Sequence, residues 1–405
     1  MKILHVVPTY LPATRYGGPI YSVHGLCRGL VENGHEVDVL TTSVDGPDDS
    51  DVAHGRPVDV EGVKVTYFRS RVGRRLYWSP PMRDALEASI ERYDVLHLHA
   101  VFLWPTNMAA RVAQERGVPY VISPRGMLVP ELITRKSRWV KTGWLTLIES
   151  TTLAGAAHVH MTSARELQDA RRMPLPLPSP RVIPNGVLGP QPGFQADVSE
   201  RARALIARGP YVLFLGRVHW VKGLPRTVEA LHGTPMRLLA CGPDDEGYAR
   251  ELRGIAEQLG VAPQLQIEEP VKGADKWALL AAARAVVLAS DSENFGNVVP
   301  EAMWMGTPIV VTDTTGASEV VARAGCGFVC RRDAGELRSA LLRLWQDEQL
   351  RNAMGEVGAR YVREHLSWRG VAHTMQSCYE SARYESARYE SARYESALAQ
   401  RDRLR

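Results

Sequence analysis

Two cations stand in a loop of the second half of the chain where a phosphate group can bind. Arg217 and Lys222 belong to the segment GRVHWVKG, which follows an expected strand, Tyr211–Gly216, and opens an expected helix. Glycine lets the backbone approach a ligand closely, and a helix N-terminus favours anions. Arginine can bind two phosphate oxygens at once, so the pair suits a diphosphate. The alternative is that both are solvated cations on a surface loop.

Two glutamates farther along the chain are separated by seven residues. Glu293 and Glu301 lie in SENFGNVVPEA, after an expected strand, Ala285–Ala289, and across the start of an expected helix near Asn297. The backbone N–H groups of residues 295–298 would then point towards a bound anion, and a carboxylate beside them can accept hydrogen bonds from sugar hydroxyls. The alternative is that Glu301 is an ordinary acid of the first helical turn, where the helix dipole favours it.

Glycines and histidines in the first half are candidates for the same kind of ligand. Gly17 and Gly18, in YGGP, follow the first expected strand and precede a helix, so they form either a close approach to a ligand or a flexible turn. We expect His97 and His99, on the expected strand Val95–His99, to point to opposite faces and not to share a metal. We favour His99, at the carboxyl end of that strand, as a polar contact or proton carrier over a purely structural histidine, and we expect no metal site.

The elements around these motifs form two similar series. Short β-branched apolar runs alternate with helical patterns, a stretch rich in proline and glycine follows over 174–192, and the alternation then restarts. In the first half the expected strands are Ile3–Val7, Val37–Thr41, Val63–Phe68, Val95–His99, Val118–Ser123 and His158–Thr162, and the expected helices are Ile20–Asn33 and Leu86–Tyr93. Continuous apolar strands between helices indicate parallel sheets covered on both faces.

We therefore predict an α/β fold with two tandem, doubly wound, Rossmann-like domains and a C-terminal helical tail. The domains span 1–187 and 188–366, and the tail spans 367–405. Open parallel sheets bind ligands at the carboxyl ends of their strands, so we expect a cleft between the two sheets.

Composition and charge exclude several other classes of protein. The chain has 405 residues, of which 45% are hydrophobic and 23% charged, so it is not a disordered, collagen-like or disulfide-scaffold protein. A net charge of +4 gives no argument for a nucleic-acid partner. The five cysteines are scattered, and the sequence shows neither an export signal nor a long uncharged apolar run. We therefore expect a cytoplasmic protein with no transmembrane helix.

These motifs, in this order, resemble the retaining glycosyltransferases of family 4, or group 1 glycosyltransferases, which have the GT-B fold. Besides the loops above, the resemblance rests on ENGHEVDVL (32–40), DVLHLH (94–99), IPNGV (183–187) and EAMWMGTPIVVTD (301–313), and it covers about residues 1–370. The segment SPRG (123–126) departs from the Thr-x-His type of many relatives and resembles a subset with SPRGML. That departure makes Arg125 a candidate contact for the acceptor.

The resemblance implies that the first domain carries the acceptor side of the site and the second domain the nucleotide-sugar side, and it implies a role for each motif. Arg217 and Lys222 would hold the diphosphate of the donor, Glu293 would lie near the transferred sugar, and Glu301 near the donor ribose. The backbone of Phe295, Gly296 and Asn297 would meet sugar and phosphate, and Gly18 would approach the phosphate from the first domain. His99 would face both donor and acceptor. Glu293, His99, Arg217 and Lys222 are thus the expected catalytic residues.

The implied reaction moves a hexosyl group from a nucleotide-diphosphate sugar to a saccharide or a polyprenyl-linked saccharide, with retention of configuration. It would serve cell-envelope or exopolysaccharide synthesis and needs no cofactor and no metal. Two alternatives stay open. A nucleotide-sugar 2-epimerase uses two such domains and would convert the donor alone. A non-catalytic sugar-nucleotide-binding subunit is disfavoured by the complete set of cations and acids.

Two further segments lie outside these motifs. The sequence YESAR repeats from Tyr379, and its five-residue spacing spreads the tyrosines around a helix, which favours a solvated terminal helix over a partner-binding rod. The part near Trp368–Cys378 would cross back to the first domain. The segment 131–149 is either an ordinary domain helix or a peripheral membrane contact. Its cations and aromatic residues are Arg135, Lys136, Arg138, Lys141, Trp139 and Trp144.

Overall fold

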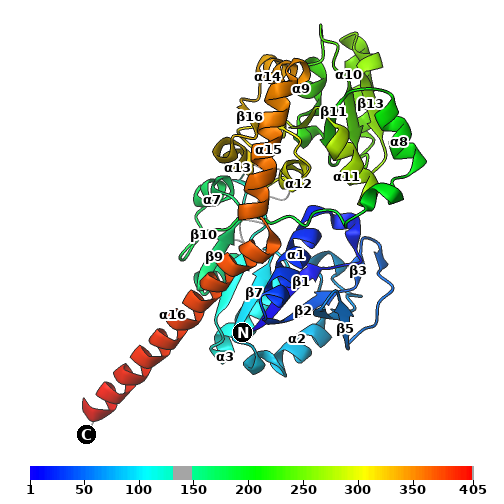
Figure 1. Cartoon of the computed structure of the whole chain (residues 1–405). Coiled ribbons are helices and arrows are strands. Elements are labelled where there is room, and N and C mark those ends of the chain that lie inside the picture. The colour runs from blue at the N-terminus through cyan, green and yellow to red at the C-terminus, as the bar shows by residue number, and fades with distance from the viewer. Residues whose placement is uncertain (131–147, 404–405) are drawn as a thin grey trace. The chain divides into compact units, whose positions relative to one another are not determined.

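The structure, a computed structural model, describes residues 1–130 and 148–403 (Figure 1). It divides into two compact units: unit 1 comprises Met1–Asn185 and Trp368–Arg405, and unit 2 comprises Gly186–Ser367. The segment 131–149, for which we weighed a membrane contact, lies outside the described residues except for its last two. Among the helices of the described residues, none has the length and apolar character needed to cross a membrane.

The described part of unit 1 is built on an eight-stranded sheet with the order β10-β9-β8-β7-β1-β2-β6-β5. Its strands are β1 (Lys2–Thr9), β2 (Glu36–Thr42), β5 (Pro57–Val60), β6 (Val63–Phe68), β7 (Val95–His99), β8 (Tyr120–Ser123), β9 (His158–Met161) and β10 (Arg181–Val182). A separate two-stranded ribbon joins β3 (Val44–Asp45) to β4 (Asp48–Asp49). All neighbours in the large sheet pair in parallel except β5 and β6, which are antiparallel at its edge.

Helices follow the strands of unit 1 as the alternation of the sequence predicts. They are α1 (Gly18–Glu32), α2 (Pro80–Glu87), α3 (Trp104–Arg116), α6 (Ser150–Ala154), α7 (Ala164–Arg171) and, from the end of the chain, α16 (Trp368–Arg403). The helix expected over 86–93 is wrong: Pro80 and Pro81 start the helix earlier, and a short 3₁₀ turn, Ile90–Arg92, follows its end. Proline suits the first helical turn because an N–H group at that position would have no acceptor within the helix.

The last helix of the chain packs on the first helix of unit 1. A Cβ at Gly25 of α1 would lie 2.2 Å from the Trp368 ring, and one at Gly29 only 2.4 Å from the Trp368 carbonyl oxygen. Buried residues of α16 continue this contact at Val371, Ala372, Met375, Cys378, Tyr379 and Ala382. The expectation of a solvated tail is therefore wrong for the first YESAR repeat, whose tyrosine is fully buried in unit 1.

The described part of unit 2 has a six-stranded parallel sheet with the order β13-β12-β11-β14-β15-β16. Its strands are β11 (Val212–Leu215), β12 (Leu238–Cys241), β13 (Leu265–Glu268), β14 (Ala285–Leu288), β15 (Ile309–Thr312) and β16 (Gly327–Cys330). Its helices are α8 (Glu200–Ala207), α9 (Leu224–Glu229), α10 (Tyr248–Gln258), α11 (Gly273–Ala282), α12 (Val298–Trp304), α13 (Ser318–Ala324), α14 (Ala334–Gln346) and α15 (Glu348–His365). Both units thus have the doubly wound α/β architecture that the sequence predicts.

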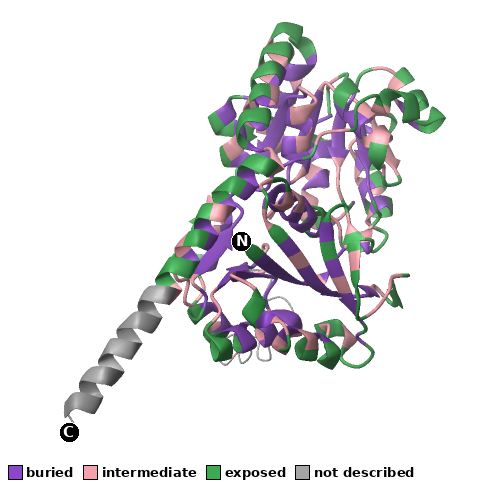
Figure 2. Ribbon diagram, turned by 60° about the horizontal axis from the view of Figure 1, so that its bottom comes forward, coloured by how far each residue is buried: buried purple, intermediate pink, exposed green. Residues whose placement is uncertain are grey.

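The central strands of both sheets are buried along their whole length because helices cover both faces. Every residue of β7, β8, β14 and β15 is buried. Figure 2 shows the buried residues gathered in the strands and on the helix faces that lie against them. A parallel strand buried on both sides cannot show the alternation of a half-exposed strand, so its continuous apolar run is the expected signal.

Candidate active site

The strand order of the sheet in unit 2 reverses between β11 and β14. From β11 the chain adds β12 and β13 on one side, then returns to place β14, β15 and β16 on the other. The two loops that follow β11 and β14 therefore lie next to each other at the carboxyl edge, where open α/β sheets bind ligands. They are joined directly: the N–H of Asp291 donates to the carbonyl of Val221 at 2.8 Å, and Arg226 donates to the carbonyl of Ala289 at 2.9 Å.

This contact brings a predicted cation and a predicted acid together. Lys222 forms an ion pair with Glu293, and their side chains are only 14% and 19% exposed. Glu301, on α12, pairs instead with Lys276 of α11, at 2.9 Å between Nζ and Oε1. Each acid thus has its own lysine. Sequence reasoning missed Lys276, which stands in a helix (GADKWALL) with no motif around it.

The loop that carries Glu293 is pinned to the segment after β15. The carbonyl oxygens of Glu293 and Phe295 accept from the N–H groups of Gly316 and Ala317, each at 2.9 Å. Gly296 has φ +89°, and a Cβ there would lie 2.6 Å from the Leu288 side chain, so this position requires glycine. Asn297 stands at the residue before α12, as the sequence predicts. The backbone of this loop is therefore held in one conformation.

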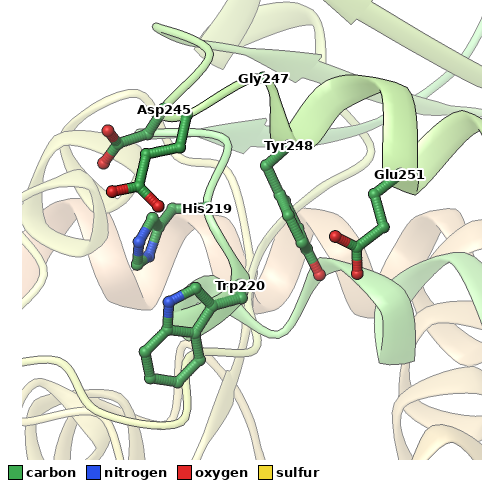
Figure 3. Close-up of a pocket in the computed structure, with 7 residues that line it drawn as sticks. His219, Trp220, Asp245, Gly247, Tyr248 and Glu251 are labelled. Atoms are coloured by element: carbon green, nitrogen blue, oxygen red, sulfur yellow. The ribbon is translucent and has the colours of Figure 1, made fainter. Parts of the chain in front are cut away.

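Arg217 does not join the Lys222–Glu293 ion pair but pairs with a different acid. Its side chain is 57% exposed and binds Asp245, which follows β12, at 2.7 Å. Beside it lies a hollow of about 370 Å³, lined by His219, Trp220, Asp245, Glu246, Gly247, Tyr248 and Glu251. Figure 3 shows the rings of His219, Trp220 and Tyr248 around this hollow, with carboxylates on either side. Rings next to carboxylates suit a ligand that has both a flat face and hydroxyl groups.

The sheet of unit 1 also reverses direction, between β1 and β7, and histidines gather there. The expectation that His97 and His99 point to opposite faces is wrong, because residues two apart on a strand share a face. Their ring centroids are 4.1 Å apart, and His5 of β1 lies 5.2 Å from His99. Imidazole nitrogens of these three residues lie within 4.8 Å of one another.

Hydrogen bonds account for the ring nitrogens of His97 and His99, whereas Nε2 of His5 is buried and has no hydrogen-bond partner among the described residues. His97 contacts the hydroxyls of Tyr379 at 2.7 Å and Ser123 at 2.6 Å. His99 contacts Nδ1 of His5 at 2.9 Å through Nε2, and its own Nδ1 accepts from Arg125 at 3.3 Å. Both ring nitrogens of His97 and of His99 are thus engaged, and a guanidinium adjoins His99. The arrangement is a hydrogen-bonded cluster beside a cation.

Burial keeps these imidazoles neutral. It lowers the pKa of His5 and of His160, which also binds Ser123, to about 3 in each case, and Arg125 adds to the effect. Burial lowers the pKa of His97 and of His99 well below the usual 6.5, and in His99 the nearby Arg125 lowers it further. A neutral imidazole donates from one nitrogen and accepts at the other, so His99 can make both of its hydrogen bonds without carrying charge.

Left-handed backbone marks the carboxyl edge of this sheet. Ala100, Phe102 and Arg125 have φ of +69°, +63° and +56°, in the turns that follow β7 and β8. Such conformations are unfavourable for residues other than glycine and cluster at functional sites. Gly18, the first residue of α1, follows β1 and so lies at the same edge, as the sequence predicts. Sequence reasoning missed the strained turns because nothing in residue type reveals them.

Both halves of the chain match models of glycosyltransferase domains. Residues 17–186 match the glycosyl transferase 4-like domain, and residues 198–361 match the glycosyl transferases group 1. The chain belongs to the group 1 glycosyltransferases. This glycosyltransferase is 26% identical over 408 residues to an uncharacterized glycosyltransferase of Methanocaldococcus jannaschii, a match that covers 94% of this chain and 98% of the relative.

Other relatives and solved structures agree. The D-inositol 3-phosphate glycosyltransferase of Xylanimonas cellulosilytica is 28% identical over 410 residues, covering 94% of this chain and 96% of that protein. The sucrose-phosphate synthase of Thermosynechococcus elongatus matches with a TM-score of 0.70 at 22% identity, covering 94% and 98% of the two chains. HepE of Anabaena, solved with UDP-glucose, matches with a TM-score of 0.71 at 18% identity, covering 94% and 100%. The GT-B fold is thereby confirmed.

Proposed function

We propose that this glycosyltransferase moves a hexosyl group from a nucleotide-diphosphate sugar to a saccharide or lipid-linked saccharide, with retention of configuration and without a metal. Its setting would be the synthesis of cell-envelope or exopolysaccharide glycans. The observation that carries the proposal is the Lys222–Glu293 ion pair at the point where the sheet of unit 2 reverses direction. A cation and an acid at this edge can hold a phosphate and a sugar side by side.

The chemistry follows from where negative charge develops. When the bond between the anomeric carbon and the diphosphate breaks, charge accumulates on the departing phosphate oxygens. Lys222 and Arg217 would stabilise that charge, exchanging part of their contact with Glu293 and Asp245 for the phosphate. The acceptor hydroxyl would attack from the face that the diphosphate leaves and give its proton to the departing phosphate oxygen, with no covalent enzyme intermediate. Glu301 would accept hydrogen bonds from the donor ribose.

A donor screen tests this proposal. UDP-, GDP- and ADP-hexoses are added to the protein one at a time, and the melting temperature is measured. A ligand at 100 times its dissociation constant adds about 2.7 kcal/mol of stability, which is a readily measured shift. UDP-glucose is the first choice because HepE was solved with it. A donor that stabilises the protein is then incubated alone: an epimerised nucleotide sugar would replace the transfer proposal with the 2-epimerase.

The acceptor side includes a membrane proposal. We propose that the basic and aromatic segment 131–149 contacts an anionic membrane surface and so meets a lipid-linked acceptor. Wild-type protein should then cosediment with anionic liposomes at low salt and be released as salt rises. The variant with Arg135, Lys136, Arg138 and Lys141 all changed to Gln should stay in the supernatant and bind the donor normally. Wild-type protein that stays in the supernatant at low salt would favour a saccharide acceptor that is not bound to lipid.

A further inference from the structure

The first two YESAR repeats have opposite environments although their sequence is the same. Tyr379 is fully buried, whereas Tyr384, five residues later on the same helix, is 65% exposed. The first repeat is also fixed at its end, where Arg383 pairs with Asp94 at 3.0 Å, just before β7. Figure 2 shows this part of α16 lying against the strands of unit 1. The first repeat is therefore packed against unit 1, whereas the tyrosine of the second repeat is exposed.

The hydroxyl of Tyr379 ends a hydrogen-bond chain whose direction is fixed. At the far end, Nε2 of His160 must donate to the carbonyl of Ile183, at 2.9 Å, because a carbonyl can only accept. Nδ1 of the neutral His160 then accepts from the Ser123 hydroxyl, at 2.7 Å. The Ser123 oxygen in turn accepts from Nε2 of His97, at 2.6 Å. Nδ1 of His97 is left as an acceptor, and the Tyr379 hydroxyl donates to it, at 2.7 Å.

These hydrogen bonds hold the ring of His97, against which the ring of His99 packs. The rings of His97 and His99 are 4.1 Å apart, and Nδ1 of His99 accepts from the Arg125 guanidinium at 3.3 Å. Without the hydroxyl, the buried Nδ1 of His97 loses its partner, and an unsatisfied buried acceptor favours rotation or displacement of the ring. A displaced His97 ring moves the surface that orients His99, and with it the contact to Arg125.

We propose that Tyr379 is a positioning residue for His99 and Arg125, so that the first YESAR repeat is part of the acceptor-side site of unit 1. The proposal rests on the proposed function and on the roles that the family resemblance implies there, His99 as a contact of donor and acceptor and Arg125 as a contact of the acceptor. Tyr379 acts through His97 and touches no substrate. The second repeat has no such role, since the side chain of Tyr384 is mostly exposed.

The test compares Tyr379→Phe with Tyr384→Phe, which remove the same hydroxyl from the same repeat unit. Both variants keep the aromatic ring, and a melting curve for each verifies that the fold is retained. In steady-state transfer assays we expect Tyr379→Phe to lower kcat about 10- to 100-fold with little change in the KM of the donor. A contact of the reacting groups that is misplaced by about 1 Å lowers the rate by about that much. Tyr384→Phe should match the wild type. Equal rates in all three proteins would overturn the proposal.

Two further measurements separate positioning from simple docking of the helix. Arg383→Gln breaks the ion pair with Asp94 but leaves the hydroxyl of Tyr379 in place, so it should keep kcat within about twofold of wild type; a loss equal to that of Tyr379→Phe would contradict the proposal. Nitrogen-15 NMR of wild-type protein should show the proton of His97 on Nε2, and a proton on Nδ1 would also overturn it. Because this spectrum needs no substrate, it tests the hydrogen-bond chain to Tyr379 even if the donor screen fails, and so separates a failure of this inference from a failure of the proposed function.

Discussion

The ion pair of Lys222 and Glu293 couples two residues that the sequence presents as separate motifs. Both side chains are mostly buried, so removing one leaves the other charge without its partner. The residue types and their loops could be predicted from the sequence, because each loop follows an apolar strand. The pairing could not, since it depends on β11 and β14 being neighbours in the sheet. The same holds for Glu301, whose partner Lys276 comes from another helix.

The role of Arg217 can be tested against a matched control, because Arg201 of unit 2 forms a similar exposed ion pair. Arg217 binds Asp245 at 2.7 Å, and Arg201 binds Glu268 at 2.8 Å. Exposed pairs contribute little stability, so neither alanine variant should unfold. We expect Arg217→Ala to lose about 30- to 1,000-fold in turnover, the usual cost of a lost charge-stabilising contact, and Arg201→Ala to keep its rate. A similar loss in both variants would argue against a diphosphate at Arg217.

The two acids should separate kinetically. We expect Glu293→Gln to lower kcat, because this side chain is predicted to lie at the transferred sugar, and Glu301→Gln mainly to raise the KM of the donor, because it is predicted to lie at the ribose. Gln keeps the shape of each side chain and removes its charge. Steady-state kinetics with the donor varied measures both constants. Equal, small effects on both constants in both variants would show that the assignment is wrong.

The buried histidines make unit 1 sensitive to mild acid. The pKa of His5 and of His160 is lowered to about 3 by burial, whereas an unfolded histidine has a pKa of about 6.5. As pH falls, the unfolded chain binds a proton at each of these imidazoles before the folded chain does, so protonation favours unfolding. The free energy of unfolding is therefore unaffected by these two histidines above about pH 6.5 and decreases as pH falls towards 3. Urea unfolding should therefore show a free energy of unfolding lower at pH 5.5 than at pH 7.5, by about 1.4 kcal/mol for each such imidazole. An unchanged free energy would mean that these rings are not buried and neutral.

At the scale of elements, the sequence predicts strands better than helix bounds and side-chain directions. Continuous apolar runs located the central strands within one or two residues, whereas the helix expected over 86–93 in fact begins at Pro80. His97 and His99 were assigned opposite faces although their spacing places them on one. The burial of Tyr379 could not be predicted, because its repeat is identical in sequence to the exposed repeat that follows it. Only the packing of the start of α16 against α1, β7 and β8 distinguishes the two.

That packing makes a prediction about Gly29. Alanine within a helix is normally more stable than glycine by up to about 1 kcal/mol. At Gly29 the added Cβ would lie 2.4 Å from the carbonyl oxygen of Trp368, which is backbone and cannot rotate away. We expect Gly29→Ala to lower the free energy of unfolding by about 1–3 kcal/mol, as overpacking does. Gly254→Ala is the control: in α10 its Cβ meets no atom within 4 Å, so it should be neutral or stabilising. Equal behaviour of the two variants in urea unfolding would show that α16 does not pack closely on α1.

At the scale of the molecule, each unit presents one point where its sheet reverses direction, and the motifs of the sequence gather at both. The cations and acids of unit 2 lie after β11 and β14, and Gly18 and His99 of unit 1 lie after β1 and β7. The alternation of strands and helices predicts this architecture because parallel sheets require it. The return of the chain to unit 1 at Trp368 gives that unit a residue, Tyr379, from the far end of the sequence.

Release of nucleoside diphosphate tests the central claim, that a nucleotide sugar donates its hexosyl group at the edge of the sheet in unit 2. Wild-type protein and Lys222→Ala are incubated with UDP-, GDP- and ADP-hexoses and a panel of saccharide and polyprenyl-linked acceptors, with excess EDTA present. We predict that one donor gives nucleoside diphosphate and a hexosylated acceptor with wild-type protein. Lys222→Ala should be slower by about 30-fold or more. Failure of every donor, or equal release by the variant, would contradict this account.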